Sequence, residues 1–395
     1  MGQSRHIAVA IPMMAELDNL PKILEALRNQ TYRNFSLYAC LNQPEGWSES
    51  PIDKEQDAYK QNQTCLSILK GISDIEIGIV DRSSEGFGWT KKKSGVGWAR
   101  KELFSKIIEE RGEDCIIASM DADTQFSNNY LEHLAEYFNN NPKVSALCVP
   151  YRHPLSGDET MDRAMLRYEI YMRHYLISLL KIKNPYAFSA LGSAMAFPGW
   201  AYQRVGGITP LQGGEDFYLM QKFCKTGEIG RQFPEYVEPQ GRASWRVPFG
   251  TGPAVAKGVE SMDASYPFYP EEGFKAIAET FTMFPALYEK DVETPMSAFL
   301  RSQLKTEDLW GKLRKNFKTK ELFVHACEER ADGLRILQFL RTFYPTTPAD
   351  SCKNFMDFCL SNGIALPENF SFLSTKIEEL DDIRNQFFEI EMRLR

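Results

Sequence analysis

The sequence predicts an open α/β domain with a mostly parallel sheet and flanking helices, followed by a mostly helical C-terminal region. Short β-rich runs alternate with helical patterns up to about Pro150, as in strand–helix units stacked on a parallel sheet. After Pro150 this alternation weakens, and from about Pro270 onward only helical patterns remain. The length of 395 residues is enough for two or three domains, each with its own core.

In the first part of the chain, predicted strands alternate with predicted helices. The strands are residues 7–11, 35–41, 76–80, 115–120 and 144–149, and the helices between them are 19–29, 57–69, 97–110 and 129–139. The first helix carries Leu20, Ile23, Leu24 and Leu27 on one face, which is the spacing of an amphipathic helix. The run 115–120 has the apolar character and length of a buried strand.

Beyond Pro150 the predicted elements are longer and less regular. A long helix is expected over 162–180 and a short helix over 217–225. Residues 192–215 form a glycine-rich stretch, and 236–252 are rich in Pro, Gly and aromatic residues, which indicates loop.

Composition excludes several classes of protein. The chain holds 46 Lys and Arg against 53 Asp and Glu, and the net charge of −7 offers no broad basic face for nucleic acid. The eight cysteines form no C-x-x-C pair, and half of them lie in apolar runs, which indicates free thiols in a reducing compartment. The first apolar run contains Pro12 and is followed at once by Glu16 and Asp18, unlike a secretory leader, and no run is long enough to span a bilayer. We therefore expect a soluble cytoplasmic protein.

Polar side chains follow four of the predicted strands. They are Glu16, Asn42, Asp81 and the pair Asp121 and Asp123. In open α/β sheets ligands bind outside the carboxyl ends of the strands, so these side chains are candidates for a site. Two carboxylates one residue apart can hold a hard divalent cation and leave positions for phosphate oxygens and water. The alternative is an acidic turn that caps the following helix.

Several short motifs occur in an order that resembles the GT-A glycosyltransferases of the family 2 type, over roughly residues 5–250. The motifs are Ala10-Ile11-Pro12 with Glu16, Asn42, Gly97-Trp98-Ala99-Arg100, Asp121-Ala122-Asp123, Gly192-Ser193-Ala194-Met195, Val205-Gly206-Gly207 and Gly214-Glu215-Asp216. The resemblance implies a GT-A domain over 1–255, with a nucleotide-binding half (1–125) and an acceptor half (126–255). The helical region, 256–395, lies outside it.

The resemblance also implies a nucleotide-diphospho-sugar donor. Pro12 and Glu16 would frame the nucleotide, and Asn42 would lie near the base, where the family usually carries Asp. The Arg100 guanidinium would lie over the nucleotide pocket; the alternative is an arginine on the helix surface. Gly192 would let the backbone approach the sugar, unless its small size serves packing alone.

The resemblance implies that the first acidic motif binds a metal ion. Asp121 and Asp123 would hold Mg²⁺ or Mn²⁺ against the diphosphate. No histidine occurs between His174 and His325, so the further histidine ligand of many relatives is absent or replaced by water.

The second acidic motif would supply the catalytic carboxylates. Asp216 would be the general base that deprotonates the acceptor hydroxyl, with Glu215 orienting the acceptor or the base, and the product would have inverted configuration. The alternative role of both carboxylates is to cap a helix N-terminus.

A cationic and aromatic loop is the candidate lid. Arg242 and Arg246, with Trp245 between them, would close over the donor phosphates. Trp200 and Trp245 are the tryptophans expected to stack on an acceptor. Lys91 to Lys93 would either sense the diphosphate or form a solvated loop.

The function that this reading favours is transfer of a sugar to a hydroxyl acceptor in polysaccharide or glycoconjugate assembly. The acceptor would be a carbohydrate or a lipid-linked sugar, and a lipid-linked acceptor would bring the enzyme to a membrane that it does not span. The alternatives are a retaining glycosyltransferase or nucleotidyltransferase on the same scaffold, and a scaffold protein without catalysis.

Overall fold

The computed structural model describes residues 5–90, 92–241, 251–260 and 266–395. The chain divides into two compact units: unit 1 is Met1–Gly157 with Phe188–Ala256, and unit 2 is Asp158–Ala187 with Lys257–Arg395. The long helix predicted at 162–180 groups with unit 2 in this division, whereas the sequence-based boundary assigns it to the first domain.

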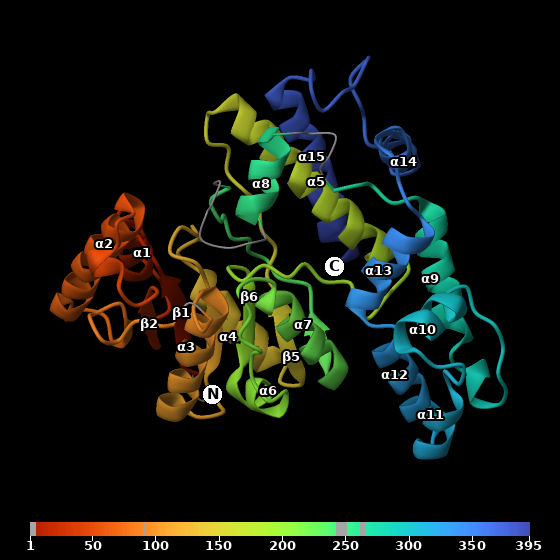
Figure 1. Ribbon diagram of the computed structural model, residues 1–395, viewed down its shortest axis with the longest axis horizontal. Helices are drawn as coiled ribbons and strands as arrows, with labels where there is room; N and C mark the ends of the chain where they lie inside the picture. Colours follow the sequence, from red (N-terminus) through yellow and green to blue (C-terminus); the bar gives the residue numbers. More distant parts are fainter. Residues whose placement is uncertain (1–4, 91, 242–250, 261–265) are drawn as a thin grey trace. The chain divides into compact units, whose positions relative to one another are not determined.

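Unit 1 contains one sheet. Its strands are β1 (Ile7–Met13), β2 (Phe35–Asn42), β3 (Ile77–Arg82), β4 (Ile116–Ser119), β5 (Val144–Cys148), β6 (Met195–Pro198) and β7 (Glu228–Gly230). Among the described residues the strand order is β3-β2-β1-β4-β6-β5-β7. β6 runs antiparallel to β4 and β5, and the other neighbouring pairs are parallel. The predicted α/β class with a mostly parallel sheet is confirmed (Figure 1).

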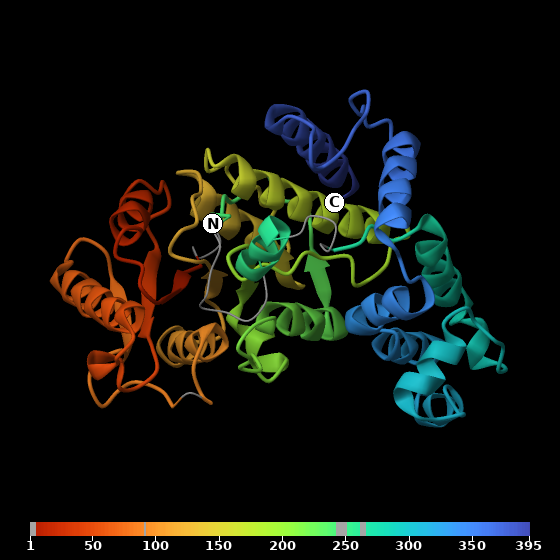
Figure 2. The ribbon, with the colours of Figure 1, turned by 45° about the horizontal axis from the view of Figure 1, so that its top comes forward.

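The helices of unit 1 connect these strands and flank the sheet (Figure 2). They are α1 (Leu20–Arg28), η1 (Trp47–Glu49), α2 (Asp53–Gly71), α3 (Val96–Arg111), α4 (Tyr130–Asn140), α6 (Gly199–Arg204) and α7 (Glu215–Thr226); α8 (Thr251–Glu260) follows at the boundary between the units. The predicted apolar face of α1 is confirmed, because Leu20, Ile23, Leu24 and Leu27 are all buried.

The stretch 192–215 is more regular than its glycine content indicates. It contains β6 and α6, which the sequence analysis did not predict. The four residues of β6 are too few to show a hydrophobic period, and the strand is specified by its partner: Met195 pairs with Ser119 of β4 and Pro198 with Ile116. β7, with three residues, was missed for the same reason.

Unit 2 is helical in its described residues, as predicted. Its elements are α5 (Glu159–Lys181), α9 (Glu271–Met283), η2 (Ala286–Tyr288), α10 (Ser297–Leu304), α11 (Gly311–Asn316), α12 (Lys320–Arg330), α13 (Gly333–Phe343), α14 (Pro348–Ser361) and α15 (Ile377–Leu394). α5 packs along α15. None of the helices in the described ranges is long and apolar enough to cross a membrane. All eight cysteines are free thiols, and Cys352 alone among them is exposed.

Buried charges join α5 to α15. Arg173 is fully buried and binds Glu169 at 2.7 Å and also Glu391, both of them fully buried. Arg384 lies 3.4 Å from Glu169 and is 1% exposed. Buried ions are stable only while each has its counter-charge, so this network couples the two helices strongly.

Glu391→Ala should therefore destabilise unit 2, because it removes a counter-charge from two buried arginines, Arg173 and Arg395. Breaking a buried pair costs about 3–5 kcal/mol, measurable as a lower free energy of unfolding in urea. Asp357→Ala is the control, since the Lys353–Asp357 pair on α14 is exposed and its loss should leave the free energy of unfolding nearly unchanged. Equal losses in the two variants would contradict the role given to the buried network.

Candidate active site

The carboxyl ends of β1 to β4 meet at one edge of the sheet, because these four strands are mutually parallel. The amide of Met120 donates to the carbonyl of Ala10 at 3.1 Å, so the acidic turn that begins at Asp121 starts beside the end of β1. Pro12 lies near the same end of β1 and pairs with Cys40 of β2. The structure thus brings Pro12 and the acidic turn to one edge, as the sequence predicts.

Asn42, at the end of β2, is buried and holds two strand ends together. Its Nδ2 donates to the carbonyl of Met13 at 3.0 Å. Asn62 of α2 donates to the carbonyl of Asn42 at 3.3 Å and accepts the amide of Ala15 at 3.0 Å. Asn62 was missed in the sequence, where a buried polar residue in a helix gives no signal until its partners are known.

Glu16 is also buried, at 5% exposure. Its carboxylate accepts the Nδ2 of Asn19 at 2.7 Å, and its carbonyl accepts the amide of Leu20 at 3.0 Å. Glu16 therefore fixes the start of α1 directly after β1.

Asp81, at the end of β3, is satisfied within its own turn. Its carboxylate accepts the amides of Ser83 and Ser84 at 2.9 and 3.0 Å, and both hydroxyl groups. Burial acts to raise the pKa of Asp81, but these hydrogen bonds outweigh burial and lower it. No site role is needed to explain this carboxylate.

Arg100, in the second turn of α3, lies at the centre of what we call the acidic edge, the sheet edge that carries Asp121, Glu215 and Asp216. Its guanidinium donates to Asp121 at 2.7 Å and to Glu215, the first residue of α7. The side chains of Arg100 and Glu215 are 4% and 2% exposed, whereas that of Asp121 is 40% exposed. Burial acts against the charge of Arg100, but attraction by the surrounding carboxylates prevails and raises its pKa. Arg100 is thus a buried residue that joins β4, α3 and α7.

Gly192 lies directly against the guanidinium of Arg100. A Cβ at this position would overlap with Nη1, Nη2 and Cζ of the arginine. The carbonyl of Gly192 accepts the hydroxyl of Ser119 at 2.7 Å, which fixes the backbone beside the end of β4. Gly192 therefore permits the approach of backbone to the charged group, and Ser119 is a further supporting residue that the sequence did not reveal.

Asp216 follows Glu215 and is partly buried. Burial, and then repulsion by Glu215, raise its pKa to about 7, although Arg100 and the amide of Phe217 act to lower it. The amide of Phe217 donates to the carboxylate at 2.7 Å. A carboxylate with a pKa in this range can take up a proton at neutral pH.

The acidic turn presents the two predicted metal ligands. The amide of Thr124 donates to the carbonyl of Asp121 at 3.1 Å, which closes the turn, and Ala122 is buried inside it. Asp123 is half-buried. Over the residues that the structure describes, no group of three His, Cys, Asp or Glu side chains could hold a metal ion.

The remaining predicted residues fall into two groups. Arg242, Trp245 and Arg246 lie outside the described residues. Trp200 lies at the opposite edge of the sheet, because the antiparallel β6 carries the chain from Met195, opposite the end of β4, to Pro198, opposite its beginning. The structure therefore places Trp200 away from the acidic edge, and its stacking on an acceptor stays a prediction.

Gly192→Ala should destabilise unit 1, because the guanidinium that it would strike is held by two carboxylates. Overpacking of a tight interior costs about 1–3 kcal/mol, which thermal unfolding would detect. Gly71→Ala is the control, since no atom lies within 4 Å of its Cβ position and its φ is not positive. An unchanged melting temperature in Gly192→Ala would show that Arg100 can move freely.

Asp216→Asn should stabilise the protein at neutral and alkaline pH. With a pKa of about 7 in the folded state, Asp216 keeps its proton between about pH 4 and pH 7, where an unfolded Asp has lost it. Stability contributed by this group is therefore lost as pH rises to about 7, and the amide removes that loss. The gain in melting temperature should grow from pH 4 to pH 7 and then level off.

Asp81→Asn is the matched control and should have the opposite sign, because the pKa of Asp81 is lowered in the fold. A gain for Asp216→Asn that does not change with pH would contradict the raised pKa.

A comparison with known protein families matches a segment that contains residues of this edge. Residues 89–197 match the family model described as glycosyl transferase family 2. The matched segment begins before α3 and ends in β6, and it contains Arg100, Asp121, Asp123 and Gly192. No curated protein sequence matches the chain.

Solved structures show distant similarity. S. aureus TarS 1–349 in complex with UDP-GlcNAc has 11% identity and a TM-score of 0.42, over 98% of this chain and 90% of that chain. The mannosyltransferase PcManGT from Pyrobaculum calidifontis, in complex with GDP-Man and Mn²⁺, has 14% identity and a TM-score of 0.40, over 83% and 88%. The family-model match, on a mostly parallel sheet that carries the matched residues at one edge, indicates a glycosyltransferase with a GT-A fold, in which residues 89–197 are the segment similar to family 2.

Proposed function

We propose that this glycosyltransferase is inverting and moves a sugar from a nucleotide-diphospho-sugar donor to a hydroxyl group of a carbohydrate or lipid-linked acceptor, in polysaccharide or glycoconjugate assembly. The observation that carries the proposal is the raised pKa of Asp216 beside the Arg100–Asp121 pair. A carboxylate near its pKa at neutral pH can take the proton of the acceptor hydroxyl as that oxygen attacks the anomeric carbon. A single displacement of this kind inverts the configuration at that carbon.

The donor is held by residues at the ends of the first strands. Pro12, Glu16 and Asn42 frame the nucleotide, where β1 and β2 end side by side. Gly192 is a further candidate donor residue, and its lack of a side chain lets the Arg100 guanidinium pack against the backbone beside the end of β4. Arg242 and Arg246 follow as candidate phosphate ligands on the lid.

Asp121 and Asp123 would hold Mg²⁺ or Mn²⁺. Carboxylate oxygens suit these hard cations, and the 40% exposure of the Asp121 side chain leaves it accessible. When bound, the cation neutralises charge on the departing diphosphate. The guanidinium of Arg100, which is paired with Asp121, would be a second positive charge beside this carboxylate.

Glu215 has a positioning role in this proposal. Its carboxylate is buried against Arg100 and is therefore occupied, whereas the neighbouring Asp216 is only partly buried. The Arg100–Glu215 pair fixes the first turn of α7, and with it the direction of the Asp216 carboxylate. Binding of the acceptor at a membrane surface would need no change in these roles.

Calorimetric titration of UDP, GDP, CDP and dTDP, with and without Mn²⁺, tests the proposal together with an assay of sugar transfer. One nucleotide should bind the full chain in a metal-dependent way, and Asp123→Ala should abolish that binding. Asp216→Asn should bind the nucleotide normally but lose turnover by about 10²–10⁴-fold, and NMR of the product should report inversion.

Asp114→Asn is the control, since Asp114 is exposed and precedes β4 at the opposite edge of the sheet. Full turnover in Asp216→Asn, retained configuration or release of pyrophosphate would each overturn the proposed mechanism. Absence of binding by all four nucleotides would favour a scaffold role.

A further inference from the structure

We infer that the acceptor is an anionic glycan, bearing phosphate or carboxylate groups, which binds over a cationic and aromatic surface at the start of α3 and continues along the groove beside that helix. The surface consists of Lys93, Trp98 and Lys101, and we call it the Trp98 platform. This inference rests on the proposed function, because it names the class of acceptor for the same enzyme.

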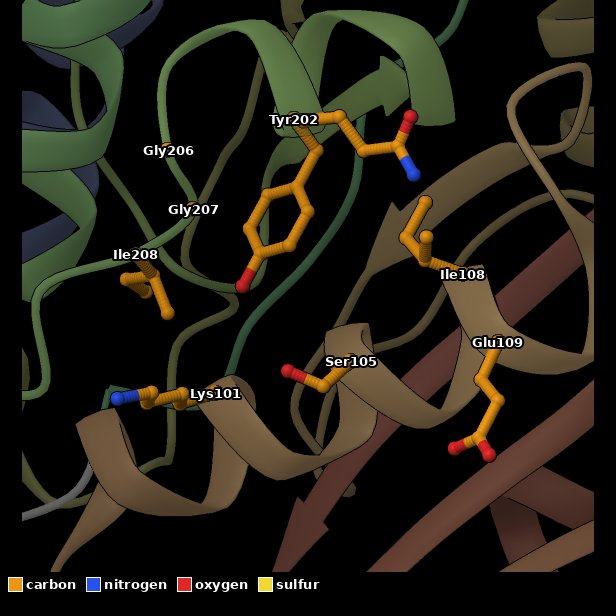
Figure 3. Close-up of a pocket in the computed structure, with 9 residues that line it drawn as sticks. Lys101, Ser105, Ile108, Glu109, Tyr202, Gly206, Gly207 and Ile208 are labelled. Carbon is orange, nitrogen blue, oxygen red and sulfur yellow. The ribbon is translucent and has the colours of Figure 1, made fainter.

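The groove lies between α3 and the segment that follows β6 (Figure 3). Its volume is about 580 Å³, within the range of about 300–1,000 Å³ that is typical of ligand sites. It is lined by Lys101, Ser105, Ile108, Glu109, Tyr202, Gln203, Gly206, Gly207 and Ile208. Figure 3 shows Lys101, Ser105 and Glu109 spaced along one side of α3, with Tyr202 opposite them. The groove is therefore elongated along the helix and polar on one wall.

The backbone of one groove wall is fixed near Tyr202. The amide of Gly207 donates to the carbonyl of Tyr202 at 3.0 Å. Gly207 has φ +74°, and a Cβ there would lie 3.1 Å from the Tyr202 hydroxyl oxygen, so a side chain at this position would be strained. A groove preformed in this way loses little conformational freedom when a ligand binds.

The Trp98 platform carries positive charge for which the described residues form no ion pair. The Nζ atoms of Lys93 and Lys101 lie 5.9 and 5.2 Å from the centre of the partly exposed Trp98 ring. In the described part of the chain no carboxylate lies within 4.0 Å of either ammonium group, whereas Lys106 on the same helix pairs with Glu110 at 2.5 Å. In a chain of net charge −7, such a surface attracts anions.

The platform and the groove are connected to the proposed base by one short segment. The chain passes from Ile208, at the groove, to Leu211, whose backbone is so close to Gly97 of α3 that a Cβ on this glycine would overlap with it. Five residues further on is Asp216. A ligand in the groove therefore lies beside the segment that ends at the base.

The chemistry of the platform matches a charged sugar polymer. The apolar face of a sugar ring can pack on the Trp98 indole, as flat apolar groups pack on aromatic rings. The ammonium groups at its border would form charge-assisted hydrogen bonds with phosphate or carboxylate oxygens. A neutral glycan would gain the stacking alone.

Binding of maltohexaose and of phosphorylated maltohexaose to the full chain, measured by calorimetry, tests the inference. The phosphorylated probe should bind at least about tenfold more tightly, which corresponds to one charge-assisted hydrogen bond. The double variant Lys93→Gln/Lys101→Gln should lose that difference, and Trp98→Ala should weaken both probes. Lys106→Gln is the matched control and should keep the difference.

Nucleotide binding and vesicle binding show which site and which ligand account for the result. Nucleotide binding with Mn²⁺ should be unchanged in the single variant Lys101→Gln, which leaves Lys93 in place, so a failure there concerns the proposed function and not the acceptor class. Equal affinity for both probes in the unmodified protein, or a difference that survives in the double variant, would overturn the inference. Binding of phosphatidylglycerol vesicles that depends on Lys93 and Lys101, without binding of the glycan, would overturn it in favour of a membrane surface.

Discussion

A single buried cation, the guanidinium of Arg100, determines the arrangement of the acidic edge of unit 1. Because the group is almost fully buried, it must have counter-charges, and it receives them from Asp121 after β4 and from Glu215 at the start of α7. Segments far apart in the sequence are thus held together by one charge. Gly192 is part of the same constraint, since no side chain fits between the backbone and the guanidinium.

The group formed by Arg100, Asp121, Glu215 and Asp216 has more negative than positive charge. This imbalance explains why the three carboxylates have different roles. One cation faces Asp121, Glu215 and Asp216, which together exceed what it can neutralise. Glu215, directly bound and buried, stays paired with the arginine. Asp216 is partly buried and is repelled by the carboxylate of Glu215, so its pKa rises into the neutral range. Asp121, the most exposed of the three, remains open to an added cation.

Much of this edge could be predicted from the sequence, because strand ends and turn residues are local signals. The apolar stripe of α1 and the acidic turn after an apolar strand required no knowledge of the partner elements. The four residues of β6 could not be predicted, since their position depends on pairing with β4. The reversed direction of β6 also places Trp200 at the edge away from the acidic residues. Asn62 and Ser119 were missed because a buried polar residue is recognised only when its hydrogen-bond partner is known.

The division of unit 2 into two chain segments has a consequence for synthesis of the protein. α5 leaves the ribosome with Glu169 and Arg173 on it, but Arg384 and Glu391 of α15 follow much later in the chain. At about 5–20 residues per second, the roughly 220 residues between Glu169 and Glu391 take on the order of 10–45 s to be made. During that interval α5 is a nascent helix without the partner that buries its charges, so Glu169 and Arg173 must stay hydrated or be covered by a chaperone. The unit can close only after translation has passed α15.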